Sequence, residues 1–210
     1  MSKLQKQALN LERFTITYNV VELAVAVSAG LTAGLMSLVG FGVDSGIETI
    51  SAVLVLNRLR AEFYKNDISA EKELKTLKLI GLTFFALAAY LVFEAVSRLF
   101  THEEPDTSTV GLVLLGLSVV IMPFLAIQKL KVGKAINSRL LIADAAETKL
   151  CAWMSVSTLI GLVLFQLTSW NGFDSIAGLI IAGFAISEGR EAWGGELVCD
   201  DCDCVGKCTC

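Results

Sequence analysis

Long apolar runs separated by short polar segments are the dominant pattern along the chain. A helix needs about 20 mainly apolar residues to cross the hydrocarbon core of a bilayer. Six runs come close to or exceed this length, and none shows the strict alternation expected of a half-buried strand. We therefore predict an all-α membrane protein with six transmembrane helices. The predicted spans are residues 15–39, 40–56, 77–100, 109–127, 140–167 and 172–187.

The composition supports this interpretation. Hydrophobic residues make up 54% of the chain, charged residues only 18%, and the mean hydropathy is +0.66. A soluble domain has about 25% charged residues. No basic patch is interleaved with aromatic residues, so nucleic acid is not an expected partner. The first run is too long for the core of a signal peptide, and we interpret it as a retained helix. The lipid bilayer is the expected surrounding.

The distribution of Lys and Arg predicts the orientation. Most of the 17 basic residues fall in three segments: the N-terminus, the loop from the second span to Lys78, and the loop from the fourth span to Arg139. The loop at residues 101–107 is acidic instead. By the positive-inside rule both termini are cytoplasmic, as an even number of spans requires. We thus divide the chain into a cytoplasmic N-terminus (1–14), a membrane domain (15–194) and a cysteine-rich tail (195–210).

Acidic side chains recur inside the predicted spans at helical spacing. Asp44 and Glu48 are four residues apart in the second span, so they share one helical face. Glu147 and Cys151 have the same spacing in the fifth span, and Asp144 lies on that face one turn earlier. Ionisable residues at membrane depth are costly and are therefore functional candidates.

Two helices that each offer two ligands a turn apart can enclose one four-coordinate cation. Carboxylate oxygens and a thiolate suit a divalent ion such as zinc. We therefore predict a transport site formed by Asp44, Glu48, Glu147 and Cys151, with Asp144 as a secondary ligand or relay.

Several of these residues also allow a purely structural interpretation. A single buried acid is often a hydrogen-bonded packing residue, and for Glu22 and Asp174 this alternative carries equal weight. A lone cysteine such as Cys151 often fills space as a small apolar residue. Lys149 points elsewhere on the fifth span, where it either reaches toward the cytoplasm or pairs with an acid.

The last twelve residues concentrate five of the six cysteines in C-x-x-C and C-x-C spacings. Such thiolates can converge on a soft ion, and zinc, cadmium and copper(I) all favour them. We predict metal binding by the tail, for delivery, buffering or sensing; the alternative is a disordered tail with incidental cysteines. The tail ligands are Cys199, Cys202, Cys204, Cys208 and Cys210.

Three segments together resemble the membrane domain of the cation diffusion facilitator (cation efflux) family. They are "YNVVELAVAVSAGLTAGLMSLVGFGVDSGIETISAVLVLNRLR", "LIADAAETKLCAWMS" and "FDSIAGLIIAGFAISEGREAW", and the likeness covers nearly all of residues 12–194. The resemblance implies a cation-efflux-type six-helix bundle whose transport site lies in the second and fifth helices.

The chain departs from the family pattern at the ligands. Family members usually place Asp or His, then Asp, in the second helix, and His or Asp, then Asp, in the fifth. The matching positions here hold Asp44 with Glu48 and Glu147 with Cys151. The only histidine, His102, falls in the predicted external loop. This departure weakens the inference of zinc selectivity and leaves the transporter interpretation in place.

A second departure concerns assembly. Typical members carry a soluble cytoplasmic domain that dimerises and senses metal, whereas only 17 residues follow Trp193 here. We expect that domain to be absent and a homodimer, which the family implies, to rest on the helices. Gly30 and Gly34 form a G-x-x-x-G pair that serves either close contact between copies or packing within one bundle.

These features together predict a proton-coupled antiporter that exports a divalent metal from the cytoplasm. Desolvation favours the protonated form of a carboxylic acid, and an entering metal displaces protons from its ligands. Zinc is the first candidate; cadmium, cobalt, iron(II) and manganese remain open. No resident cofactor is expected, and a bacterial cell membrane is the expected location. The alternative is a membrane protein that senses or stores metal without transporting it. An enzyme is not expected, because the sequence offers neither a Gly-rich phosphate loop nor a nucleophile with a nearby histidine base.

Overall fold

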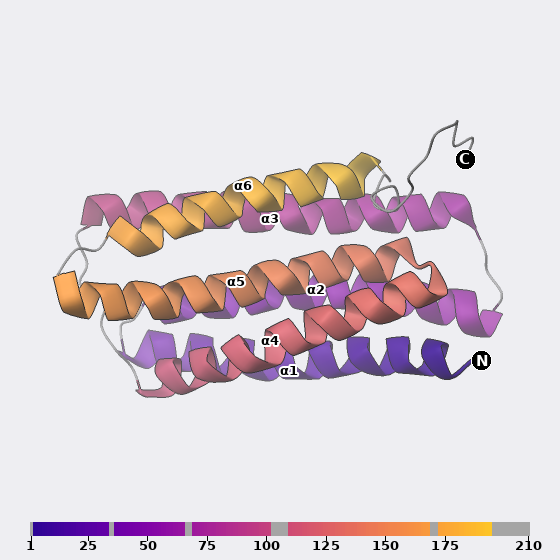
Figure 1. Cartoon of the computed structure of the whole chain (residues 1–210), viewed down its shortest axis with the longest axis horizontal. Helices are drawn as coiled ribbons and strands as arrows, with labels where there is room; N and C mark the ends of the chain where they lie inside the picture. The colour runs from indigo at the N-terminus through magenta and orange to yellow at the C-terminus, as the bar shows by residue number, and fades with distance from the viewer. Residues whose placement is uncertain (1, 34–35, 66–68, 102–108, 169–171, 195–210) are drawn as a thin grey trace.

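The computed structural model describes residues 2–33, 36–65, 69–101, 109–168 and 172–194. These residues form six long helices and confirm the predicted all-α membrane bundle (Figure 1). The helices are α1 (Lys3–Ala33), α2 (Met36–Lys65), α3 (Ala70–Thr101), α4 (Thr109–Ile136), α5 (Arg139–Thr168) and α6 (Gly172–Gly194).

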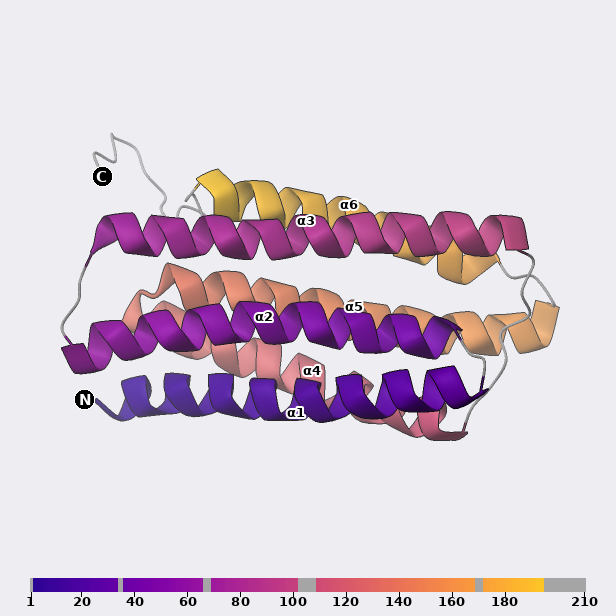
Figure 2. The ribbon, with the colours of Figure 1, turned by 180° about the vertical axis from the view of Figure 1, so that it is seen from behind.

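The helices lie side by side along one axis and alternate in direction. α3 and α6 form one packed pair, α1 and α4 lie at the opposite side, and α2 and α5 occupy the centre (Figures 1 and 2). α1 begins at the same end of the bundle at which α6 ends. We call this the N-terminal end. The two helices predicted to carry the ligands therefore lie at the centre of the bundle.

The outer surface is apolar, as a membrane-spanning bundle requires. Large side chains such as Phe93, Val120 and Leu31 are 72%, 70% and 66% exposed. Among the described residues, four helices are long and apolar enough to cross a membrane; the qualifying stretches are Lys3–Thr32, Leu38–Lys65, Ala70–Ser97 and Thr109–Ile136.

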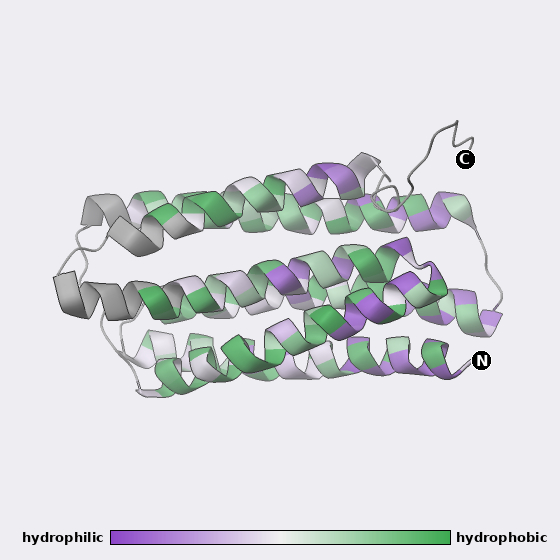
Figure 3. Cartoon of the chain, viewed as in Figure 1, coloured by the Kyte–Doolittle hydropathy of each residue, from purple (hydrophilic) through white to green (hydrophobic). Residues whose placement is uncertain are grey.

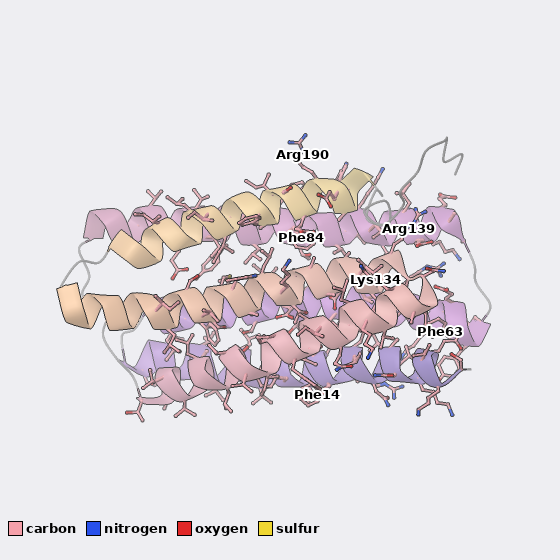
Figure 4. The ribbon with its side chains drawn as sticks, viewed as in Figure 1. Phe14, Phe63, Phe84, Lys134, Arg139 and Arg190 are labelled. Carbon is pink, nitrogen blue, oxygen red and sulfur yellow. The ribbon has the colours of Figure 1, made fainter. Side chains whose placement is uncertain are left out.

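Polar residues gather at the N-terminal end, where hydropathy changes sharply along the helices (Figure 3). Figure 4 places Lys134, Arg139 and Phe63 at this end. Most of the basic residues counted in the orientation argument lie on the helical segments at this end. It is therefore the end that the positive-inside rule assigns to the cytoplasm.

Several helix boundaries differ from those predicted. α1 begins at Lys3, so the proposed cytoplasmic N-terminus continues the first helix. α1 ends at Ala33 and α2 begins at Met36, earlier than the predicted start at residue 40. Residues 23–43 contain no charge, so hydropathy does not mark the turn. α2 also continues to Lys65, because Arg, Glu and Lys are good helix formers outside the lipid.

The turn between α4 and α5 is set by local sequence. Asn137 has a φ of 53°, in the left-handed region that asparagine tolerates better than most residues. The Ser138 N–H then donates to the Gly133 carbonyl at 2.9 Å, which closes the end of α4. The Ser138 hydroxyl accepts the Leu141 N–H at 3.4 Å and caps α5. This turn holds α4 and α5 antiparallel.

α3 and α6 approach closely through glycine. A Cβ atom on Gly81 would lie 3.0 Å from the Gly189 carbonyl oxygen, and a Cβ on Gly189 would lie 3.0 Å from the Phe84 Cβ. Both contacts are tighter than side chains normally make. The two helices can therefore pack at this distance only while both positions lack a side chain.

Replacing Gly81 with leucine should separate α3 from α6. We expect Gly81→Leu to lower the free energy of unfolding by about 1–3 kcal/mol, because the new side chain meets backbone atoms that cannot move aside. Thermal unfolding in detergent measures this. Gly183→Leu on α6 is the matched control, since a Cβ there meets nothing within 4 Å. Equal stability of the two variants would contradict the close crossing.

Candidate functional site

The five candidate ligands in α2 and α5 all face the interior of the bundle. The exposed fractions are 2% for Asp44, 1% for Glu48, 0% for Asp144, 1% for Glu147 and 1% for Cys151. α2 and α5 contact each other directly at the centre of the bundle. The sequence-based prediction that these residues share an inward face agrees with the structure.

These residues belong to a larger band of buried polar side chains, together with the half-buried Tyr18, which we call the polar seam. It runs along the interface of α1, α2, α4 and α5, with one contribution from α3. Because the helices alternate in direction, the seam divides into three levels counted from the N-terminal end. Level one holds Glu12, Ser51, Lys129, Asp144 and Thr148; level two holds Asn19, Glu48, Thr83 and Glu147; level three holds Tyr18, Glu22, Asp44, Ser45, Ser118 and Cys151.

Glu22 in level three is held by hydroxyl groups from three helices. Its carboxylate accepts hydrogen bonds from the Ser45 hydroxyl at 2.8 Å, from the Tyr18 hydroxyl at 3.1 Å and from the Ser118 hydroxyl. Tyr18 and Ser118 also contact each other at 3.0 Å. The carboxylate is thus fully provided with donors. Of the two interpretations left open for Glu22, this arrangement favours a packing role that ties α1, α2 and α4 together.

Asp44 and Cys151 face each other across the α2–α5 contact in the same level. The Asp44 Oδ2 atom is buried and has no hydrogen-bond partner among the described residues. The Cys151 thiol is a free, buried thiol. A carboxylate and a thiol therefore meet at the position where the sequence predicts two ligands of one cation.

The two glutamates of level two are poorly provided with donors. Within the described residues, neither Glu48 carboxylate oxygen has a hydrogen-bond partner, although Asn19 and Thr148 are its neighbours. Glu147 accepts the Thr83 hydroxyl at Oε2 over 3.4 Å, and its Oε1 atom has no such partner. These oxygens have electron pairs available for a cation.

Level one contains a buried lysine surrounded by acids. The Lys129 ammonium donates to the Asp144 carboxylate and, at 3.1 Å, to the Thr148 hydroxyl, and it lies 3.7 Å from Glu12 Oε2. Asp144 also accepts the Ser51 hydroxyl at 3.0 Å. Lys129, Glu12 and Asp144 are each 0% exposed. The level is an ionic network contributed by α1, α2, α4 and α5.

The position of Lys129 corrects the sequence-based assignment. The distribution of charges predicts that Lys129 lies in a cytoplasmic loop, whereas it lies inside α4 with its side chain buried. Lys149, which the sequence raised as a possible partner of the acids, is exposed. A signal was available in the sequence, because Lys129 continues the buried helical stripe of Ser118, Met122 and Leu125.

The four predicted transport ligands do not form one closed cage in this arrangement. Among the described residues, no three His, Cys, Asp or Glu side chains converge as the ligands of a single metal ion would. Asp44 meets Cys151, while Glu48 lies beside Asn19 and Glu147 bonds Thr83. The complete four-ligand set therefore stays a prediction. His102, Gly34 and the five tail cysteines lie outside the described residues.

The fold and seam define an integral, multi-pass membrane protein with ionisable groups in its interior. The model of the cation efflux transmembrane domain matches residues 77–192, which is more than half of the chain. The chain belongs to the cation efflux family. The matched region includes α4 and α5, and therefore Lys129, Asp144, Glu147 and Cys151.

Two curated relatives are consistent with this membership. The chain is 28% identical over 173 residues to an uncharacterized transporter from Methanocaldococcus jannaschii, a match that covers 80% of this chain and 61% of that protein. It is 24% identical over 190 residues to transmembrane protein 163 from Xenopus laevis, which covers 88% of this chain and 66% of that protein. The chain thus spans about two thirds or less of the length of each relative.

The three-hydroxyl arrangement around Glu22 predicts a measurable contribution to stability. Ser118→Ala should lower the free energy of unfolding by about 1–3 kcal/mol, because it leaves a buried carboxylate with one donor fewer. Ser28→Ala is the control, because this exposed hydroxyl donates to the Val25 carbonyl of its own helix and so links no two helices. If chemical unfolding gave the same stability for both variants, Glu22 would not depend on these donors.

Proposed function

We propose that this protein exports a divalent metal cation, zinc first, in exchange for protons. Asp44, Glu48, Glu147 and Cys151 would bind the ion. The observation that carries the proposal is the inward burial of all four on the two central helices, in a member of the cation efflux family. A chain that kept these groups only for packing would be expected to satisfy them, as it does Glu22.

The unsatisfied oxygens support a ligand role. Both oxygens of Glu48, Oδ2 of Asp44 and Oε1 of Glu147 are buried without a hydrogen-bond partner among the described residues. Leaving a buried polar group in this condition costs about 1–3 kcal/mol. A bound cation or a proton offsets this cost, and a competition between cation and proton is what a proton-coupled exchanger requires.

Small motions are sufficient to bring the ligands together. Asp44 and Glu48, like Glu147 and Cys151, are separated by four residues, or about 6 Å along the helix axis. The thiol and one carboxylate already face each other, and glutamate has three rotatable side-chain bonds. The proposed cage therefore forms around an ion by rotation of Glu48 and Glu147 toward the Asp44–Cys151 contact.

The transport cycle follows from these properties. A divalent ion enters from the N-terminal end, reaches the carboxylates and displaces protons, because ligands must be deprotonated to bind metal. The bundle then opens toward the far end, where the ion leaves and protons return. The proton gradient would supply the driving force.

Asp44→Asn tests the transport site. Asparagine keeps the shape of the side chain and removes its charge, so we expect zinc uptake into proteoliposomes under an imposed pH gradient to fall by roughly tenfold or more. Glu71→Gln, an exposed acid in the first turn of α3, should transport normally. Uptake that ignores the pH gradient, or normal uptake by Asp44→Asn, would contradict the proposal.

The sensor or storage alternative rests on the tail, whose five cysteines suit a soft ion without a folded core. The same assay separates the two functions. A chain without residues 199–210 should still transport zinc if the membrane site carries the activity. Metal tolerance in cells that depended on the tail and not on Asp44 or Glu147 would favour storage.

Cys151 is expected to set the preference for softer ions. Cys151→Asp gives the site four carboxylates, which suit manganese better than cadmium. We expect the ratio of manganese to cadmium uptake in proteoliposomes to rise by about tenfold or more. Cys151→Ala, which removes the ligand without replacing it, should reduce uptake of both metals. An unchanged ratio in Cys151→Asp would mean that the thiol is only an apolar filler.

A further inference from the structure

Lys129 is a buried cation that the proposed exchange does not use. We propose that Lys129 is a tethered counter-cation held by Glu12 and Asp144, and that a divalent ion moving along the polar seam takes its place there and draws in Glu48 as a third ligand. The inference rests on the proposed function, because it treats the seam as an ion path. It adds a cation site at level one, where the Lys129 ammonium competes with the divalent ion for the same oxygens.

The surroundings of the ammonium resemble those of a bound ion. Nζ contacts the Asp144 carboxylate, the Thr148 hydroxyl at 3.1 Å and Glu12 Oε2 at 3.7 Å. Glu48 is its third acidic neighbour. The contacting oxygens come from α1 and α5, while the lysine comes from α4. Two helices thus supply oxygens to a positive charge delivered by a third, and Glu48 of α2 adds an electrostatic attraction.

The formal charges of this level match one divalent ion. A divalent ion bound at this level would displace the protons of its carboxylic acid ligands. Deprotonated Glu12, Glu48 and Asp144 would then carry three negative charges, which equal the two positive charges of the ion plus the one of Lys129. A fully buried site is stable only when its charges are compensated in this way.

The acids of this level are incompletely used by the lysine. Glu12 Oε1 and both oxygens of Glu48 are buried and have no hydrogen-bond partner within the described ranges. A closed structural ion pair would have its remaining lone pairs filled by other donors. By contrast, Glu22 is supplied by three hydroxyls only two levels away. The free oxygens of Glu12 and Glu48 are therefore available to a second cation.

The ligand chemistry of the two sites differs, and the difference indicates the order in which an ion would meet them. Level one offers carboxylates together with the hydroxyls of Ser51 and Thr148, which suit a hard divalent ion. Level three adds the Cys151 thiol. Glu48 lies between them, near Lys129 on one side and interacting with Asp44 and Cys151 on the other. It can therefore pass an ion from the oxygen site to the mixed site.

The lysine side chain is suited to displacement of its ammonium. It carries the charge on a flexible four-carbon stem with three rotatable donors, so Nζ can change position by rotation of side-chain bonds. Arginine at the same position would pair with Asp144 through two parallel hydrogen bonds and resist displacement. An uncharged residue at position 129 should therefore strengthen binding of a divalent ion at level one, whereas arginine should weaken it.

The test is manganese binding by the purified whole chain in detergent, because Mn²⁺ favours oxygen ligands and is counted directly by electron paramagnetic resonance. Lys129→Met removes the competing charge and keeps an unbranched apolar stem. We expect it to bind Mn²⁺ about tenfold more tightly than the unaltered chain, or to gain one bound ion. Adding Asp144→Asn to this variant should remove the gain, whereas Lys129→Arg alone should bind more weakly.

Unchanged or weaker Mn²⁺ binding by folded Lys129→Met would overturn the proposal, since a purely structural lysine predicts that result. If Lys129→Met does not fold, Lys129→Arg decides: weaker binding supports displacement, and unaltered binding rules it out. The proposed function is tested separately, because a chain that fails to transport zinc can still show the gain. That gain should also persist when Asp44→Asn is added to Lys129→Met, which separates level one from the transport site.

Discussion

The structure depends on how ionisable side chains are accommodated between apolar helices. Each buried carboxylate needs a donor or a cation from another helix, because lipid and apolar side chains offer neither. The buried carboxylates of this protein differ in how completely other helices provide them with donors or cations. Glu22 is surrounded by hydroxyls and Asp144 is paired with Lys129, so both link helices together. Both oxygens of Glu48 and Oε1 of Glu147 have no hydrogen bond of normal geometry among the described residues, so these two acids are less completely satisfied than Glu22. Their retention in the interior is the physical reason for assigning them to ion binding.

The alternation of helix direction turns this unequal pattern into an ordered path. Residues a few turns apart on α1 and α5 meet residues in reverse order on α2 and α4, which stacks the three levels along the bundle axis. A charged network lies toward the basic, N-terminal end, weakly satisfied glutamates lie at the centre, and a carboxylate–thiol pair lies beside the Glu22 anchor. An ion that follows the seam thus meets oxygen ligands first and sulfur later.

The sequence predicts the parts of this arrangement that periodicity and hydropathy control. The six helices follow from the long apolar runs, and the face shared by Asp44, Glu48, Glu147 and Cys151 follows from helical spacing. The turn between α1 and α2 does not, because no charge interrupts that apolar stretch. Lys129 was missed since a charge count treats every lysine near a helix end as exposed, although its position continues the buried stripe of α4. The donors of Glu22 come from other helices, so only the packed structure reveals them.

The central claim is that α2 and α5 share one cation through three carboxylates and one thiolate. Zinc K-edge X-ray absorption on the chain with its five tail cysteines replaced by serine tests this directly. The account predicts one sulfur at about 2.3 Å and oxygen ligands at about 2.0–2.2 Å from the zinc, with the sulfur lost in Cys151→Ser. Zinc bound by oxygen alone in the chain that keeps Cys151, or no bound zinc at all, would contradict it.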